Sequence, residues 1–208
     1  IIDLEQSAKV SGSRFNYLKG DAVLIQFALF DVLFKKLLKD GFIPFMPPLL
    51  VRERALFGTS HLPEGKDQVY KIESSNVEEK ADLYLVGSSE PPLFSYCADK
   101  KFEEKNLPYK MMAQTTCFRR EVGSGGRDVK GIKRVHQFDK LEMDVVCTPK
   151  QSDKVFEYLL SINEWLLQKL ALPYRVIQKC APEAGYYATY KQYDVEVWRP
   201  TVGEFMEF

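Results

Sequence analysis

The sequence lacks several features that would define its class at once. Its four cysteines (Cys97, Cys117, Cys147 and Cys180) are separated by 20 or more residues, so no pair has zinc-ligand spacing and a disulfide framework is not expected. Neither sign of charge dominates, because 29 basic residues balance 29 acidic ones. This balance argues against a sequence-independent nucleic-acid binder with a large basic footprint. A reducing compartment is the default expectation.

Long apolar runs, internal repeats and low-complexity tracts are also missing. The most apolar segment, residues 22–38, contains Gln26, Asp31, Lys35 and Lys36, which predicts a buried helix rather than a membrane span. The first residue is Ile1 instead of methionine, so we expect that the native start is missing and that a targeting peptide cannot be judged. With 45% hydrophobic and 13% aromatic residues, the chain has the material for a packed core.

Two long helices are predicted. Residues 21–39 form the first, with Asp21 as its N-cap and Asp40–Gly41 as its end. Thr148–Pro149 begins the second, which follows over residues 151–170.

Extended segments and hairpins make up the rest of the predicted fold. Residues 41–48 contain three prolines, which keep them out of any helix or central strand, and residues 58–80 have the composition of a loop. Strands are expected at residues 83–86, 109–115, 174–179 and 193–198. Together with the two helices, this pattern predicts an α+β fold, an antiparallel sheet flanked by helices.

The segment most informative about function has the pattern of a β-hairpin with charged arms. In a strand, alternate residues share a face, so Arg119 and Glu121 share one on the first arm. On the second arm, one face carries Arg134, His136, Phe138, Lys140 and Glu142. Such a face suits a charged, partly aromatic ligand such as a nucleotide. The solvated face of an antiparallel sheet gives a similar pattern, and periodicity alone does not decide between the two.

Residues 118–142, from Phe118-Arg-Arg-Glu121 to Phe138-Asp-Lys-Leu-Glu142, strongly resemble the second signature motif of class II aminoacyl-tRNA synthetases, in its seryl form. Residues 9–20 resemble the start of the seryl-type catalytic domain. The segment Gly41–Pro48 is similar to the first class II motif, and Tyr193–Trp198 to the strand before the family's metal-binding glutamate. The resemblance covers nearly the whole chain. It implies a partial class II catalytic domain over residues 1–208, without the tRNA-binding arm and the third motif.

This resemblance implies a reaction and its partners. Serine would attack the α-phosphorus of ATP through its carboxylate, and seryl-adenylate would then pass its seryl group to tRNA(Ser). The implied cofactors are ATP and Mg²⁺, and the implied assembly is a homodimer formed through Gly41–Pro48. No membrane is implied. A cytoplasmic location is expected, and an organellar one stays open.

Site residues are implied by the same resemblance. Arg119 would be catalytic, because its planar guanidinium can bridge the substrate carboxylate and the α-phosphate. Phe138 would stack on the adenine. The residues implied to bind ATP are Arg119, Arg120, Glu121, Arg134, Val135, Phe138 and Glu207, and Glu207 would also be the metal ligand. Those implied to bind the amino acid are Ser88, Ser89, Glu90, Arg119 and Glu142. Those implied to contact the acceptor end of tRNA are Arg127, Lys130 and Lys133.

Alternatives stay open at several of these positions. The family usually has Thr-Ala-Glu where this chain has Ser88-Ser89-Glu90, so strict serine specificity is undecided. Arg119 could form a structural ion pair with Glu121 or Glu142, and Phe138 could belong to the core. His136 is expected to be structural, and His61 to lie in a loop. A ligase that loads a carrier protein and a non-catalytic nucleotide-binding paralogue are the two other functions considered.

Overall fold

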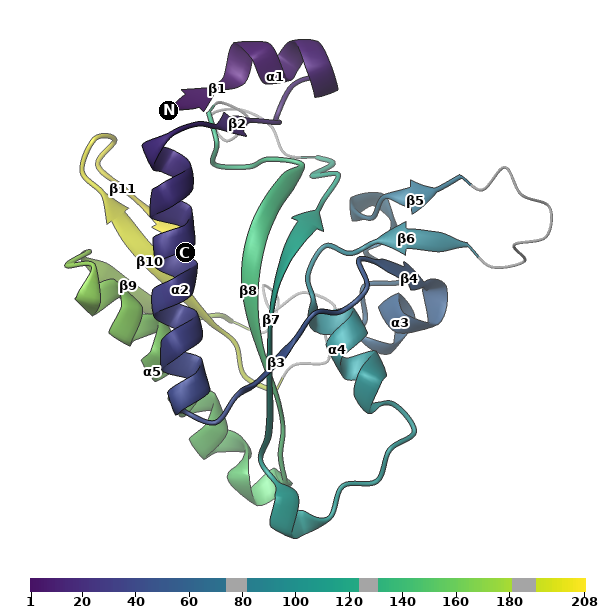
Figure 1. Ribbon diagram of the computed structural model, residues 1–208. Helices are drawn as coiled ribbons and strands as arrows, with labels where there is room; N and C mark the ends of the chain where they lie inside the picture. Colours follow the sequence, from purple (N-terminus) through teal and green to yellow (C-terminus); the bar gives the residue numbers. More distant parts are fainter. Residues whose placement is uncertain (74–81, 124–130, 181–189) are drawn as a thin grey trace. The chain divides into compact units, whose positions relative to one another are not determined.

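The computed structural model describes residues 1–73, 82–123, 131–180 and 190–208 (Figure 1). The chain divides into two compact units. The first contains Ile1–Phe102 and Tyr109–Asp144, and the second contains Glu103–Pro108 and Val145–Phe208.

Helix α2, Asp21–Lys39, is the long helix of the first unit. It ends as predicted, with Asp40 as its C-cap and Gly41 at a positive φ of 82°, a conformation that favours glycine. The predicted N-cap is wrong by one residue. Gly20, which has no side chain to cap the helix, occupies that position, and Asp21 lies in the first turn, where its charge complements the helix dipole.

Two three-stranded sheets belong mainly to the first unit. One has the order β3-β7-β8, with β3 at Ile43–Phe45, β7 at Tyr109–Phe118 and β8 at Gln137–Val146. Strand β3 pairs parallel with β7 at the edge of this sheet, where its proline is tolerated. The other is antiparallel with the order β4-β6-β5, at Leu50–Arg52, Leu83–Leu85 and Lys71–Ile72.

Several short elements complete the first unit. They are β1 (Ile2–Asp3), α1 (Leu4–Ser11), β2 (Tyr17–Leu18), α3 (Glu53–Gly58), the 3-10 turn η1 (Lys66–Gln68) and α4 (Glu90–Cys97). The predicted loop over residues 58–80 was therefore wrong in part, because it contains η1 and β5. Its residues 74–80 lie outside the described chain.

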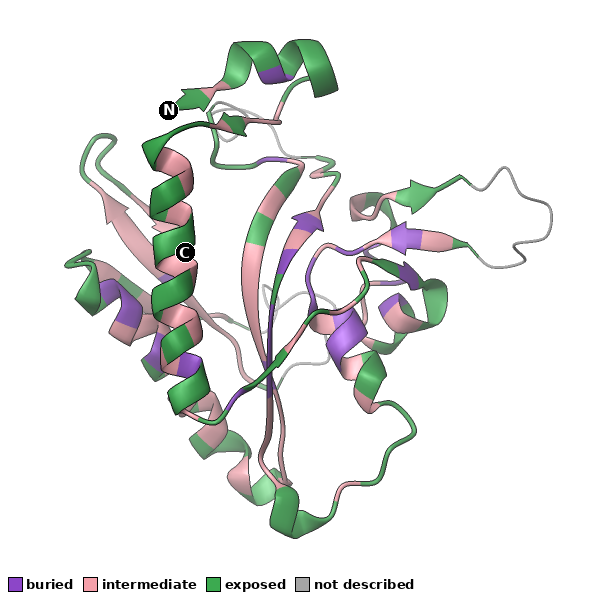
Figure 2. Ribbon diagram, viewed as in Figure 1, coloured by how far each residue is buried: buried purple, intermediate pink, exposed green. Residues whose placement is uncertain are grey.

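The core of the first unit forms around β7 and α4, where Figure 2 shows buried residues along both elements. Met111, Met112 and Ala113 of β7 and Leu93 of α4 have no exposed surface. Burying a leucine or methionine side chain contributes about 1.5–3 kcal/mol. A second apolar cluster consists of Val51, Leu56, Leu62, Tyr84 and Val86. These cores fix the ends of β6 and β7, which carry the predicted site.

The second unit pairs a helix with an antiparallel sheet of order β11-β10-β9. The sheet strands are β9 (Tyr174–Gln178), β10 (Tyr193–Arg199) and β11 (Glu204–Glu207). Two 3-10 turns, η2 (Glu104–Asn106) and η4 (Pro149–Gln151), also belong to this unit. Helix α5 runs over Ser152–Lys169 and follows a capping box between Thr148 and Gln151, as Thr148–Pro149 predicted. These elements confirm the α+β prediction. No described helix is both long and apolar enough to cross a membrane.

Candidate functional site

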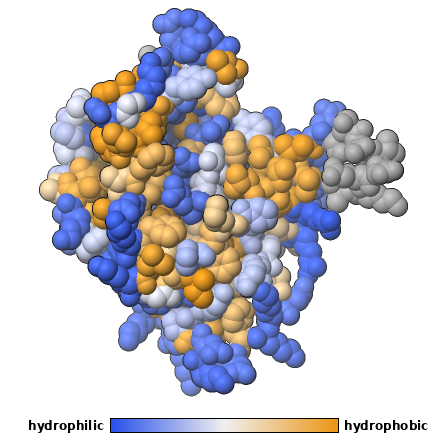
Figure 3. All heavy atoms as spheres, viewed as in Figure 1, coloured by the Kyte–Doolittle hydropathy of each residue, from blue (hydrophilic) through white to orange (hydrophobic). Residues whose placement is uncertain are grey.

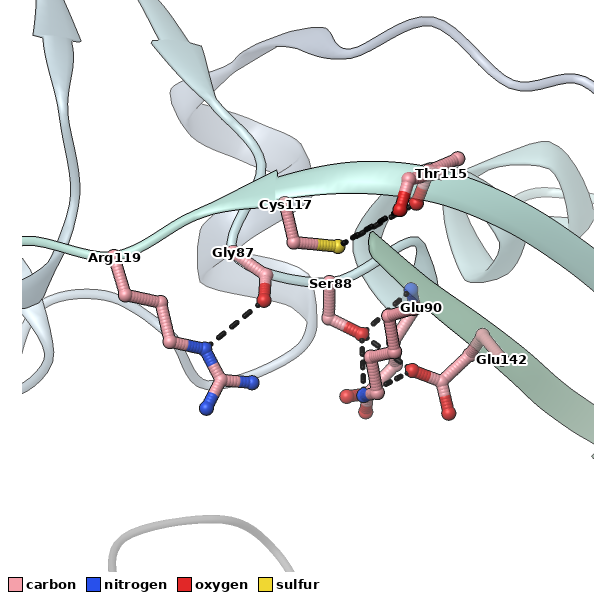
Figure 4. Close-up of polar contacts among 8 residues, drawn as sticks. Gly87, Ser88, Glu90, Thr115, Cys117, Arg119 and Glu142 are labelled. Atoms are coloured by element: carbon pink, nitrogen blue, oxygen red, sulfur yellow. Dashed lines mark hydrogen bonds and ion pairs between the residues drawn. The ribbon is translucent and has the colours of Figure 1, made fainter. Parts of the chain in front are cut away.

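The loop Gly87–Ser88–Ser89 connects β6 to α4 and forms one wall of the candidate site (Figure 4). Two prolines follow Glu90 in the first turn of α4, where a missing N–H costs nothing. They fix the start of the helix, so Ser88 and Glu90 lie together at its N-terminal end. Ser88 and Ser89 are both buried, and the Ser89 hydroxyl has no hydrogen-bond partner within the described part of the chain.

Arg119 lies directly after β7 and faces this loop. Its Nε donates to the Gly87 carbonyl at 3.0 Å, and its guanidinium carbon lies 5.2 Å from the centre of the Phe138 ring. Figure 4 shows that its two terminal nitrogens point away from Gly87. A backbone carbonyl and an aromatic face thus hold one edge of the planar cation, and the opposite edge is presented to a ligand.

Ser88, Lys140 and Glu142 form a polar cluster beside Arg119. The Ser88 hydroxyl donates to Glu142 Oε2 at 2.5 Å and accepts from the Glu90 backbone N–H at 3.3 Å. Lys140 Nζ donates to Ser88 Oγ at 3.0 Å and forms an ion pair with Glu142 Oε2. The Lys140 ammonium therefore contacts both the Ser88 hydroxyl and the Glu142 carboxylate.

The hairpin prediction is borne out in its main part. Strands β7 and β8 are neighbours in one sheet, and Phe138, Lys140 and Glu142 all face Arg119 or Ser88. Both arms are shorter than predicted, because β7 ends at Phe118 and β8 begins at Gln137. The predicted second-arm positions Arg134 and His136 therefore precede the strand. Arg119 and Glu121 therefore do not share a strand face, and Glu121 has a φ of +51°.

An ion pair joins the two chain segments at the loop end of the hairpin. Arg134 Nη1 lies 3.1 Å from Glu121 Oε2. Arg14 braces both backbones, donating from Nε to the Arg134 carbonyl at 3.1 Å and from Nη1 to the Glu121 carbonyl at 3.2 Å. Arg14 was missed by the sequence analysis, because nothing local in the sequence connects it to residues 107 and 120 positions away.

His136 has the surroundings of a structural residue. Its Nδ1 is 3.0 Å from the Arg119 carbonyl oxygen, and its ring lies 5.3 Å from that of Phe15. His61 is hydrogen-bonded through Nδ1 to the Thr59 hydroxyl at 2.9 Å, and burial lowers its pKa. Both imidazoles are thus engaged in local packing.

Three carboxyl groups, those of Glu90, Glu142 and Asp144, lie close enough to affect one another. Burial, and then the charge of Glu142, raise the pKa of Glu90. Burial, Glu142 and Glu90 raise the pKa of Asp144 to about 8. Asp144 was missed by the sequence analysis, although it is the next even residue of β8 after Glu142. Extending the same alternation by one step would have found it.

The other predicted site residues differ in their exposure and in the unit to which they belong. Arg120 and Lys133 are exposed, Val135 is buried, and Arg127 and Lys130 lie outside the described residues. Glu207 belongs to the second unit, where it is exposed on β11 opposite Glu196. The described residues contain no cluster of three or more metal-ligating side chains. A hollow of about 540 Å³ is lined by residues of α3 and α4, including Phe57 and Phe94, and by the flanking Arg52 and Asp99. Its lining contains none of the predicted site residues.

Comparison with known proteins gives the cluster a family context. The model of the tRNA synthetase class II core domain (G, H, P, S and T) matches residues 70–208. Serine--tRNA ligases of Mycobacterium marinum and Dictyoglomus thermophilum are 41% and 40% identical over the whole chain, which covers 48% and 47% of their lengths. The chain thus spans about half the length of these curated relatives.

Solved structures agree with this assignment. Seryl-tRNA synthetase from Pyrococcus horikoshii complexed with ATP superposes with a TM-score of 0.91 at 38% identity, over 99% of this chain and 44% of that one. Cytoplasmic serine-tRNA ligase from Naegleria fowleri in complex with AMP gives 0.90 at 32% identity, over 99% and 48%. Since the family model matches well over half of its residues, the chain belongs to the class II tRNA synthetase core family.

Proposed function

We propose that this chain is the catalytic core of a seryl-tRNA synthetase, which activates serine with ATP and transfers the seryl group to tRNA(Ser). The observation that carries the proposal is the cluster in which Arg119 lies over Phe138, beside the Ser88 and Glu142 pair. A cation, an aromatic ring and an ammonium-binding pair are what an aminoacyl-adenylate requires. The seryl-specific relatives support the choice of amino acid.

Positioning and electrostatics would supply the catalysis. The attacking carboxylate is already ionised, so no general base is needed. Arg119 would hold that carboxylate against the α-phosphate and stabilise the charge that develops in the transition state. Its fixation by the Gly87 carbonyl at 3.0 Å means that little reorganisation is required when substrate binds. Phe138 would stack on the adenine, and Arg134 with Glu121 would border the nucleotide.

Recognition of serine would depend on Glu142 and Ser88. A carboxylate can accept from both the ammonium and the hydroxyl of serine, so alanine would leave a buried oxygen unpaired. Ser88 provides the hydroxyl for which the family usually uses threonine, and its 2.5 Å contact with Glu142 supports the same use here.

Magnesium, the dimer and the tRNA contact belong to the same proposal. Glu207 would hold Mg²⁺, which needs only one or two carboxylates besides phosphate oxygens and neutralises phosphate charge. An exposed carboxylate on β11 fits that need. The homodimer would form through Gly41–Pro48, where Met46 is 99% exposed, and through α2, over which Figure 3 shows hydrophobic atoms. Lys133, with Arg127 and Lys130, would contact the acceptor end of tRNA.

Replacing Arg119 tests the proposed mechanism. In the protein at its full native length, Arg119→Ala should reduce serine-dependent exchange of pyrophosphate into ATP by about 100-fold or more, the usual effect of losing a fixed transition-state donor. Arg54→Ala is the matched control, since Arg54 is an exposed arginine of the same unit that pairs with Asp99. It should retain full exchange. If Arg119→Ala, shown by thermal unfolding to be folded, exchanged as fast as the control, the assigned role would be wrong.

A further inference from the structure

Lys140 occupies the centre of the polar cluster, although the proposed function gives it no task. Its side chain leaves β8 on the same face as Phe138 and Glu142. Its Nζ donates to Ser88 Oγ at 3.0 Å and pairs with Glu142 Oε2. The Lys140 side chain is 35% exposed, so it can move out into solvent.

The partners of Lys140 are the same two groups that would receive the amino acid's ammonium. A lysine side chain and an α-ammonium are both compact cations with three N–H donors, so they compete for the same acceptors. The Ser88 hydroxyl has no spare capacity while Lys140 is present. It donates to Glu142, accepts from Glu90 N–H and accepts from Lys140, which uses one donor and two acceptor positions. An incoming ammonium can reach Ser88 only if Lys140 leaves.

We propose that Lys140 is an internal substitute for the substrate's ammonium, seated on Ser88 and Glu142 while the site is empty and displaced when the amino acid binds. This inference rests on the proposed function. Lys140 would then compete with the amino acid and raise its dissociation constant. It would not contribute a contact to the bound amino acid.

The charges around Ser88 and Glu142 give a physical reason for such a substitute. Glu142 lies near the carboxyl groups of Glu90 and Asp144, and an uncompensated carboxylate in a partly buried position is costly. Lys140 supplies the missing cation. Its four-carbon stem is flexible and can withdraw without moving the backbone. Lys140 also lies near Glu90. Its positive charge lowers the pKa of the Glu90 carboxyl, whereas burial raises that pKa. Glu90 is therefore a second carboxyl group near Lys140.

Isothermal titration calorimetry of the full-length protein, with a non-hydrolysable ATP analogue present, tests the proposal. Lys140→Met keeps most of the stem and removes the cation. Serine should bind this variant about two- to five-fold more tightly than the wild type, the range that a partly exposed ion pair can withhold. The effect should reverse for 3-hydroxypropanoate, which is serine without its amino group. It should bind the variant more weakly, because neither the ligand nor residue 140 then supplies an ammonium to Glu142.

Lys71→Met is the matched control. Lys71, on β5, is another partly exposed lysine of the first unit. It forms an ion pair with Asp82 at 2.6 Å and lies outside the cluster. Its loss should leave both affinities unchanged, which separates occupancy of the site from a general change in charge. Lys140→Gln provides a second variant if thermal unfolding shows Lys140→Met to be misfolded.

Each outcome decides the matter. Tighter serine binding together with weaker 3-hydroxypropanoate binding supports the proposal. Unchanged or weaker serine binding in a folded Lys140 variant overturns it and leaves the proposed function intact, since the wild type still binds serine. Failure of the wild type to bind serine overturns the proposed function, and the Lys140 proposal with it.

Discussion

Asp144 shows what the alternation of side chains along β8 can and cannot predict about a single residue. Phe138, Lys140 and Glu142 were placed on one face by their even spacing, and the structure brings all three to Arg119 or Ser88. The next even residue, Asp144, is only 6% exposed, and its Oδ2 has no hydrogen-bond partner among the described residues. Sequence alone could not show this burial, because it depends on packing near Glu90 and Cys97 of α4.

Burial of Asp144 should make stability depend on pH. In the folded state, burial raises the pKa of Asp144 from its ordinary value of 3.8 to about 8. Between pH 3.8 and pH 8 the carboxyl is therefore protonated in the folded state and ionised in the unfolded state. The stability from this group is complete below pH 3.8 and is lost as the pH rises toward 8, by at most about 1.4 kcal/mol per unit. Asp144→Asn removes this loss. In urea denaturation, the variant should gain stability over the wild type between about pH 5 and about pH 7.5. A difference that stayed constant with pH would contradict the assignment.

At the scale of elements, patterns that extend over many residues were predicted well. Helix α5 follows from apolar periodicity and from its start signal at Thr148, and helix α2 follows from its apolar run and its end signal at Gly41. The predicted burial of the first helix was wrong, because Leu37 is the only buried residue of α2. Short elements were missed, because they contain too few residues for periodicity to show. Helix α3, for example, has only six residues. The parallel pairing of β3 with β7 joins Ile43 to Met111, and local sequence contains no information about so distant a partner.

The start of α5 offers a test of local sequence control. Thr148 and Gln151 cap each other reciprocally, with the Thr148 N–H donating to Gln151 Oε1 at 3.0 Å. Thr148→Ala should therefore lower the free energy of unfolding by about 1 kcal/mol in urea denaturation. The exposed Thr201 provides a control, and its replacement by alanine should have little effect. Equal stabilities of the two variants would show that the capping box contributes nothing.

Helix α2 and the segment after it bear on assembly. Phe27 is 58% exposed and Met46 is 99% exposed, so apolar surface is available in the region proposed to form the dimer. The double substitution Phe27→Asp with Met46→Asp should convert a dimer into a monomer in light scattering, because buried charges would face each other across the interface. Val10→Asp, at a 61% exposed position of α1, should leave the dimer intact. Persistence of the dimer in the double variant would place the interface elsewhere.

At the scale of the whole molecule, the fold class followed from the predicted order of strands and helices, and the second motif added the family. A 25-residue match from Phe118 to Glu142 carries register and topology that helix and strand patterns leave open. The α+β class, the hairpin and the Ser88–Glu142 pairing agree with it. The roles of all the predicted site residues stay predictions, since they depend on ligands rather than on contacts within the chain.

Exchange of pyrophosphate into ATP by the protein at its full native length, with serine, threonine, alanine and glycine compared, tests the central claim most directly. Serine alone should support exchange, because only serine pairs both acceptors of Glu142 and still fits beside Ser88. Exchange with alanine or glycine in place of serine would contradict the seryl assignment and favour a ligase that loads a carrier protein. No exchange with any of the four would contradict catalysis itself and leave a nucleotide-binding paralogue.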